Sequence, residues 1–127
     1  MPTPGDARSP VLLVEDHADL REALAELLEA SDYTVVTAAD GEEALACLRN
    51  GVAPCLIVLD LDMPGMDGCA FRSEQSHDAK LAAIPTIICS GRADLKQMAG
   101  RLGIHGYFEK RADAHAFLAL VAQYCSA

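Results

Sequence analysis

Two apolar runs of the chain end in carboxylates that could act together on a charged group. Glu15 and Asp16 follow the run 11–14, and Asp60 follows the run 56–59. Continuous runs of Leu, Ile and Val bounded by turn residues are typical of strands covered on both faces, and open parallel sheets bind ligands at the carboxyl ends of such strands. Three carboxylates at one sheet edge repel one another and favour the binding of a cation.

Mg2+ is the cation that best matches the carboxylates of this sheet edge. Carboxylates and Mg2+ together are suited to phosphoryl transfer. Mg2+ accepts one or two carboxylates, keeps several waters and leaves coordination for a phosphate oxygen. Two later strand ends supply a hydroxyl at Ser90 and an ammonium at Lys110. Because phosphoryl transfer is catalysed mainly by positioning and charge neutralisation, a nucleophilic Asp60, a metal, Ser90 and Lys110 form a sufficient set.

This ordered set resembles the receiver domain of bacterial two-component response regulators. The resemblance covers almost the whole chain and rests on Glu15-Asp16, on Asp60 with Met63-Pro64-Gly65-Met66-Asp67-Gly68, on Ser90 and on Lys110. It implies that Asp60 takes a phosphoryl group from a histidine kinase or a histidine phosphotransfer protein. It also implies that Glu15, Asp16 and Asp60 hold Mg2+ together with the backbone carbonyl of Asp62.

The resemblance implies roles for three further side chains. Ser90 would hydrogen-bond the phosphoryl group, and Lys110 would bridge that group and the acid. Tyr107 resembles the aromatic residue that turns inward on activation. The alternative for Tyr107 is a half-buried aromatic ring at the margin of a sheet, where aromatic residues are common.

Two features beside the site concern its regulation. Asp62 and Arg92 lie two residues beyond Asp60 and Ser90, at positions that in receivers flank the path of the water that attacks the acyl phosphate. Their opposite charges suggest a pair that hinders this water, and the alternative is a solvated pair of almost no energetic value. The residue after the site lysine is Arg111, where relatives usually have proline, so this loop departs from the family pattern.

Histidines and cysteines suggest no separate metal site. The four histidines are scattered rather than paired on one helix, so we interpret them as ordinary polar residues. His17 is the exception to follow, because it comes directly after Asp16 and can overhang the pocket. Five cysteines without C-x-x-C spacing predict reduced, mainly structural thiols at positions 47, 55, 69, 89 and 125.

Length and composition limit the class of protein. At 127 residues the chain fits one domain, and we expect a flexible leader over residues 1–9 and a single receiver domain over 10–127. A formal charge of −9 argues against a nucleic-acid surface. The sequence has no secretion signal and no apolar stretch of membrane-spanning length, which predicts a cytoplasmic protein. Met1 and the lack of a trailing linker favour a stand-alone receiver similar to chemotaxis regulators, and the alternative is a segment of a larger regulator or hybrid kinase.

Strand and helix patterns alternate along the chain. Apolar residues at helical spacing predict five helices, and short apolar runs predict five strands. We therefore expect an α/β fold with a doubly wound parallel sheet of the flavodoxin-like type, for which the resemblance implies the strand order 2-1-3-4-5. The third helix is the weakest, because the segment after Phe71 offers no second apolar turn. The expected strands lie at 11–14, 34–38, 56–60, 86–89 and 106–108, and the helices near 20–28, 41–50, 68–76, 95–102 and 113–124.

Two other functions compete with a phosphorylation switch. Asp60-Leu61-Asp62 resembles the nucleophile motif of haloacid dehalogenase-type phosphatases, but that motif ordinarily lies on the first strand, and those enzymes need a cap or a larger core. The other alternative is a constitutive docking module with a vestigial acidic pocket, against which the complete set of pocket residues argues. We favour a signalling switch rather than an enzyme, and the sequence identifies neither its kinase nor its downstream protein target.

Overall fold

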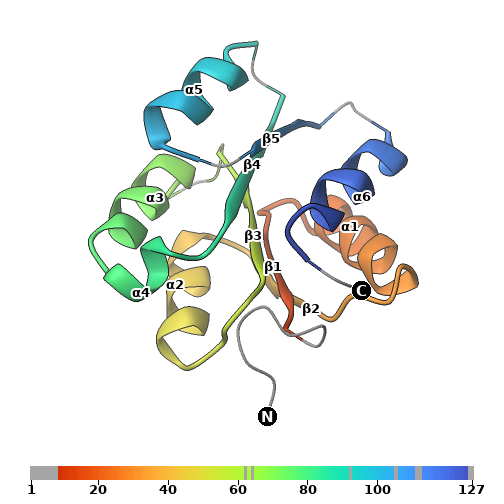
Figure 1. Cartoon of the computed structure of the whole chain (residues 1–127), viewed down its shortest axis with the longest axis horizontal. Helices are drawn as coiled ribbons and strands as arrows, with labels where there is room; N and C mark the ends of the chain where they lie inside the picture. Colours follow the sequence, from red (N-terminus) through yellow and green to blue (C-terminus); the bar gives the residue numbers. More distant parts are fainter. Residues whose placement is uncertain are drawn as a thin grey trace.

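Five parallel strands form the centre of the protein. The computed structural model describes residues 9–61, 63, 65–91, 93–104, 106–110 and 113–125. The strand order is β2-β1-β3-β4-β5, as expected, and all neighbouring pairs are parallel (Figure 1). The strands are β1 (Val11–Val14), β2 (Val35–Ala38), β3 (Leu56–Asp60), β4 (Thr86–Ser90) and β5 (Gly106–Glu109).

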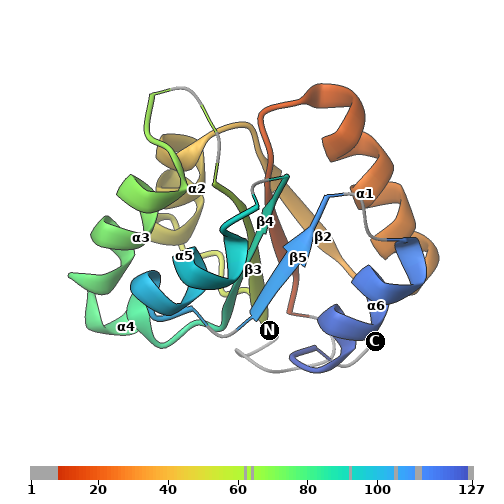
Figure 2. The same cartoon turned by 90° about the horizontal axis from the view of Figure 1, so that it is seen from above.

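Helices cover both faces of the sheet. Figure 2 shows α1 and α6 on one side and α2, α3, α4 and α5 on the other. Side chains of each strand alternate between two apolar cores, so Leu12 packs with the second group of helices and Leu13 with the first. Within the described residues no helix is long and apolar enough to cross a membrane. The helices are α1 (Ala18–Ala30), α2 (Gly41–Arg49), α3 (Gly68–Ser76), α4 (Ala79–Ala82), α5 (Leu95–Leu102) and α6 (Ala114–Ala122).

The described part of the chain has six helices where the sequence predicted five. The additional helix α4 is a single turn, and the side chain of Asp78 caps it by accepting hydrogen bonds from the backbone N–H groups of Lys80 and Leu81. A four-residue segment is too short to show helical periodicity, which is why the pattern missed it.

The third predicted helix is present as α3. Asp67 caps it by accepting a hydrogen bond from the backbone N–H of Ala70, which gives this acid a structural role at the start of the helix. Its second buried turn uses a polar residue, since Gln75 is fully buried and donates hydrogen bonds to the carbonyl of Leu81 and to Oγ1 of Thr86. The buried amide therefore supplies the anchor that apolar periodicity did not reveal.

The prediction of reduced thiols is wrong for two of the five cysteines. Cys55, just before β3, and Cys125, after α6, form a disulfide across a sequence separation of 70 residues. Both residues are buried, and their Cα atoms lie 5.6 Å apart. Cys47, Cys69 and Cys89 are free. No local spacing signals this pair, because only the fold brings the two segments together.

Candidate functional site

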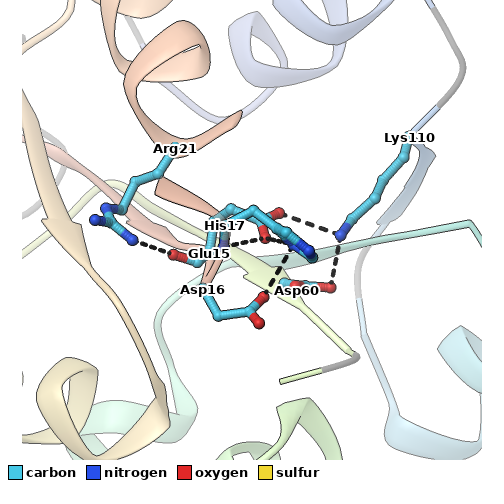
Figure 3. Close-up of polar contacts among 6 residues, drawn as sticks. All are labelled: Glu15, Asp16, His17, Arg21, Asp60 and Lys110. Atoms are coloured by element: carbon cyan, nitrogen blue, oxygen red, sulfur yellow. Dashed lines mark hydrogen bonds and ion pairs between the residues drawn. The ribbon is translucent and has the colours of Figure 1, made fainter. Parts of the chain in front are cut away.

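The predicted carboxylates meet at the carboxyl edge of the sheet. Asp60 ends β3, which lies between β1 and β4, and only 1% of its surface is exposed. Glu15 follows β1 directly and is 2% exposed. Figure 3 shows both side chains close to Asp16 and facing the ammonium of Lys110. Burying carboxylates costs solvation energy, so their charges need nearby partners.

Lys110 joins two of the three acids. Its Nζ lies 3.2 Å from Oδ1 of Asp60 and 3.3 Å from Oε1 of Glu15. The backbone N–H of Lys110 also donates a hydrogen bond to the carbonyl of Ser90, which extends the contact between β4 and β5 and places the lysine at the pocket. Burial by itself lowers the pKa of Lys110, but the charges of Asp60 and Glu15 outweigh this effect and raise that pKa above its ordinary value.

Backbone contacts fix the loop that carries Glu15. Its backbone N–H donates to the carbonyl of Ala38, and its carbonyl accepts a hydrogen bond from the guanidinium of Arg21 at 2.9 Å. Its side-chain oxygen Oε2 accepts a hydrogen bond from the backbone N–H of His17 at 3.1 Å. The loop between β1 and α1 therefore holds the first acid in a defined position.

His17 belongs to the acidic cluster. Its Nδ1 lies 3.3 Å from Oε2 of Glu15 and 3.4 Å from Oδ1 of Asp16. Burial opposes ionisation of Asp16, but interactions with the side chains of Asp60 and Glu15 and the nearby His17 keep its pKa below the usual value. His17 therefore lies beside the acids, as expected from its position directly after Asp16.

Ser90 and Tyr107 occupy neighbouring strands. Ser90 is fully buried at the end of β4, in register with Glu109 of β5. Tyr107 lies on the edge strand β5 and is 42% exposed, so its ring points outward in this structure. Asp62, Arg92 and Arg111 lie outside the described residues. Their predicted roles stay predictions.

Two neighbours of Asp60 were not among the predicted site residues. A Cβ atom on Gly68 would lie 2.7 Å from the carbonyl oxygen of Asp60 and 2.7 Å from Cα of Leu61. Only glycine therefore lets the start of α3 close onto the end of β3. Cys89 is paired in register with Asp60, and burial, with Glu15 and Asp60 nearby, raises its pKa to about 12 despite Lys110. In the sequence, the Asp67-Gly68 pair was the only signal for the close approach of α3 to the end of β3.

Comparison with curated sequences points to one family. Residues 11–122 match the sequence profile of the response regulator receiver domain. An uncharacterised 14.6 kDa protein of Leptolyngbya boryana is 33% identical over 123 residues, with 95% of this chain and 93% of that protein covered. The C4-dicarboxylate transport transcriptional regulatory protein DctD of Rhizobium meliloti is 40% identical over 86 residues. That match covers 67% of this chain but only 18% of DctD.

Solved structures show the same fold. The chemotaxis response regulator CheY4 of Vibrio cholerae superposes with a TM-score of 0.82 at 26% identity, covering 91% of this chain and 98% of that chain. The receiver domain of NtrX from Brucella abortus gives a TM-score of 0.80 at 27% identity, with 90% and 96% covered. The profile match spans most of the chain, and the strand order and overall fold agree with it. The protein therefore belongs to the receiver domain family of two-component response regulators.

Proposed function

We propose that Asp60 is the phosphoacceptor of this receiver domain. The observation that carries the proposal is the position of Lys110, whose Nζ lies within 3.3 Å of both buried acids, Asp60 and Glu15. In the reaction a carboxylate oxygen of Asp60 attacks the phosphorus of a phosphohistidine on the donor protein. An O–P bond forms as the P–N bond breaks, and the departing imidazole keeps the electron pair and takes up a proton.

The acidic cluster fits a divalent cation. Asp16 Oδ1 is buried, and among the described residues none donates a hydrogen bond to it. Receiver domains generally bind Mg2+ through such a cluster, and carboxylate oxygens are the ligands that this ion prefers. Here Glu15, Asp16 and Asp60 would hold Mg2+ with the backbone carbonyl of Asp62. Bound Mg2+ would neutralise charge on the transferring phosphoryl group.

The remaining side chains would stabilise the phosphorylated state. Lys110 already contacts Asp60 Oδ1, and we expect its ammonium to bridge a phosphoryl oxygen and the acids. The Ser90 hydroxyl would donate a hydrogen bond to another phosphoryl oxygen. Movement of Ser90 would be transmitted along β4 to the neighbouring strand β5, where Tyr107 is exposed. An inward turn of that ring would change the surface near α5 and β5.

The partners follow from this chemistry. The phosphoryl donor would be a sensor histidine kinase or a histidine phosphotransfer protein, and the surface near α5 and β5 would then bind or release a downstream protein. Similar sequences occur in a protein named histidine kinase P4, of which this chain covers 6%, and in transcriptional regulators. The strongly acidic composition argues against direct binding to nucleic acid.

The lifetime of the phosphoryl group would depend on Asp62 and Arg92. We propose that these oppositely charged residues pair at the pocket mouth and hinder the attacking water. Dephosphorylation should therefore be faster in Arg92→Ala than in the wild type. An unchanged rate would show that the pair has no such role.

Beryllofluoride with Mg2+ tests the phosphoacceptor directly, because this complex mimics an acyl phosphate on an aspartate. A ligand at 100 times its Kd stabilises the native state by about 2.7 kcal/mol. For a domain of this size that corresponds to a rise in Tm of roughly 10 °C. We expect this rise in the wild type and no rise in Asp60→Asn.

Asp67→Asn is the matched control. It makes the same chemical change seven positions along the chain, and an asparagine can still accept the capping hydrogen bond from Ala70. This variant should keep the full rise in Tm. A rise retained in Asp60→Asn, or no rise in folded wild type, would refute the proposal, and the second outcome would favour a docking module. Turnover of a small phosphomonoester would instead support the phosphatase alternative.

A further inference from the structure

His17 presents a nitrogen donor to the acidic cluster. Its Nδ1 lies 3.3 Å from Glu15 Oε2 and 3.4 Å from Asp16 Oδ1. Each of the three residues offers one ligand atom, and these atoms all lie within 4.8 Å of one another. Figure 3 shows the imidazole lying over the two acids on the side that faces Asp60 and Lys110. The cluster therefore offers one nitrogen and two oxygen ligands from three consecutive residues.

The fold of α1 does not explain this orientation. His17 occupies the N-cap position of α1, but its side chain makes no capping hydrogen bond. Serine, threonine, aspartate and asparagine are the residues that cap helices well. The ring contacts described for His17 go to Glu15 and Asp16, although 71% of its side chain is exposed and other directions are open. The imidazole is thus oriented by the acids.

The distances between the donor atoms suit a bound ion. Ligands about 2.1 Å from an octahedral ion at right angles to each other are separated by about 3.0 Å. Tetrahedral ligands at about 2.0–2.1 Å are separated by roughly 3.3–3.4 Å. The two separations from Nδ1, 3.3 and 3.4 Å, fall at the tetrahedral end of this range. Binding therefore requires little rearrangement of His17.

We propose that Nδ1 of His17 is a metal ligand that gives this site a preference for first-row transition metal dications such as Co2+, Ni2+ and Zn2+. Imidazole binds these ions well, whereas Mg2+ prefers oxygen ligands and gives up its waters reluctantly. The inference rests on the proposed function, because it uses the same acids, Glu15 and Asp16. It adds a specific role for a residue that the phosphoacceptor proposal does not need.

Metal titrations of the intact protein test this role. Co2+ is the probe, because its visible absorption reports nitrogen and oxygen ligands, and Mg2+ is titrated in parallel by calorimetry. In His17→Ala we expect the Kd for Co2+ to rise at least about tenfold and the Kd for Mg2+ to change by less than about threefold. The visible bands of bound Co2+ should shift as the nitrogen ligand is lost.

His115→Ala is the matched control, because His115 is an exposed histidine on α6 and not on the loop that carries Glu15 and Asp16. This variant should bind both ions as the wild type does. Thermal unfolding of each metal-free variant checks that the fold is kept.

The possible outcomes separate this inference from the proposed function. If His17 acted only through its charge, its removal would change the Kd values of Co2+ and Mg2+ by the same factor, and the ligand role would be refuted. If the affinity for Co2+ were unchanged in His17→Ala, the ion would be bound by other ligands, such as cysteine thiolates, and the ligand role of His17 would also be refuted. The phosphoacceptor proposal would remain intact. If the wild type bound neither Co2+ nor Mg2+, both proposals would be refuted.

Discussion

Reduction of the disulfide between Cys55 and Cys125 should weaken the fold substantially. The bond joins the segment before β3, in the middle of the sheet, to the segment after α6. A cross-link stabilises a protein mainly by reducing the conformational entropy of its unfolded chain, and the effect grows with the length of the closed loop. Reduction removes that constraint and leaves the amino-acid sequence unchanged.

The size of the effect follows from the sequence separation of 70 residues. For a loop of that length the chain-entropy relation gives about 4.4 kcal/mol at 25 °C. Measured effects commonly fall between about 2 and 4 kcal/mol, because the reduced, unfolded chain retains some structure. We expect the unfolding free energy to fall by about 2–4 kcal/mol.

Urea denaturation with and without a dithiol reductant measures this difference. For slopes of about 1–3 kcal/mol per molar urea, the midpoint should fall by on the order of 1–2 M. The Cys47→Ser variant is the control, since Cys47 is free and its loss should leave the sensitivity to reductant unchanged. Before reduction, the denatured protein should expose three reactive thiols. Five reactive thiols, or a midpoint unaffected by reductant, would refute the reasoning.

Three further predictions concern the site. Gly68→Ala should lower the unfolding free energy by about 1–3 kcal/mol and slow phosphorylation, because the new methyl group meets the carbonyl of Asp60. Gly100→Ala is the control, because Gly100 has open space around it, and this variant should neither lower the unfolding free energy nor slow phosphorylation. Lys110 has a raised pKa, so its stabilisation should be complete below its unfolded-state pKa near 10.5 and disappear as pH rises through the higher folded-state value. The difference in urea midpoint between wild type and Lys110→Met should accordingly be constant from pH 7 to about 9 and should shrink only above about 10.5. A difference that grows as pH rises would contradict this expected pH dependence. Cys89, with a pKa of about 12, should resist alkylation in the native protein at pH 8 and react only after unfolding, as mass spectrometry would show.

The strands were predictable because their apolar runs carry a strong local signal, whereas their order was expected only from the resemblance to receiver domains. Leu56, Ile57 and Val58 form a continuous apolar run, and all are buried in β3. Helix α4 and the disulfide were not predictable for the opposite reason. A single turn such as α4 has too few residues for a period, and Cys55 meets Cys125 only after the chain has folded. Periodicity therefore identifies elements, whereas contacts between distant segments need the three-dimensional arrangement.

The candidate site shows the same division. The acids and Lys110 could be placed at one edge because parallel strands share their direction, so residues that follow them share an edge. The orientation of His17 could not be deduced in this way. Its ring position depends on the loop between β1 and α1, where its own backbone N–H and Nδ1 both contact Glu15 Oε2. Nor does strand order show that Gly68 lies against the carbonyl of Asp60.

The disulfide and the phosphoryl site should behave as independent parts of the protein. Cys55 precedes β3 and Asp60 ends it, so the strand separates them by about 17 Å at roughly 3.3 Å per residue. Changes more than about 7–10 Å apart without shared partners usually have additive effects on stability. Reduction should therefore lower Tm without changing the further rise that Mg2+ and beryllofluoride produce. An altered rise would show that β3 transmits a change from one end of the sheet to the other.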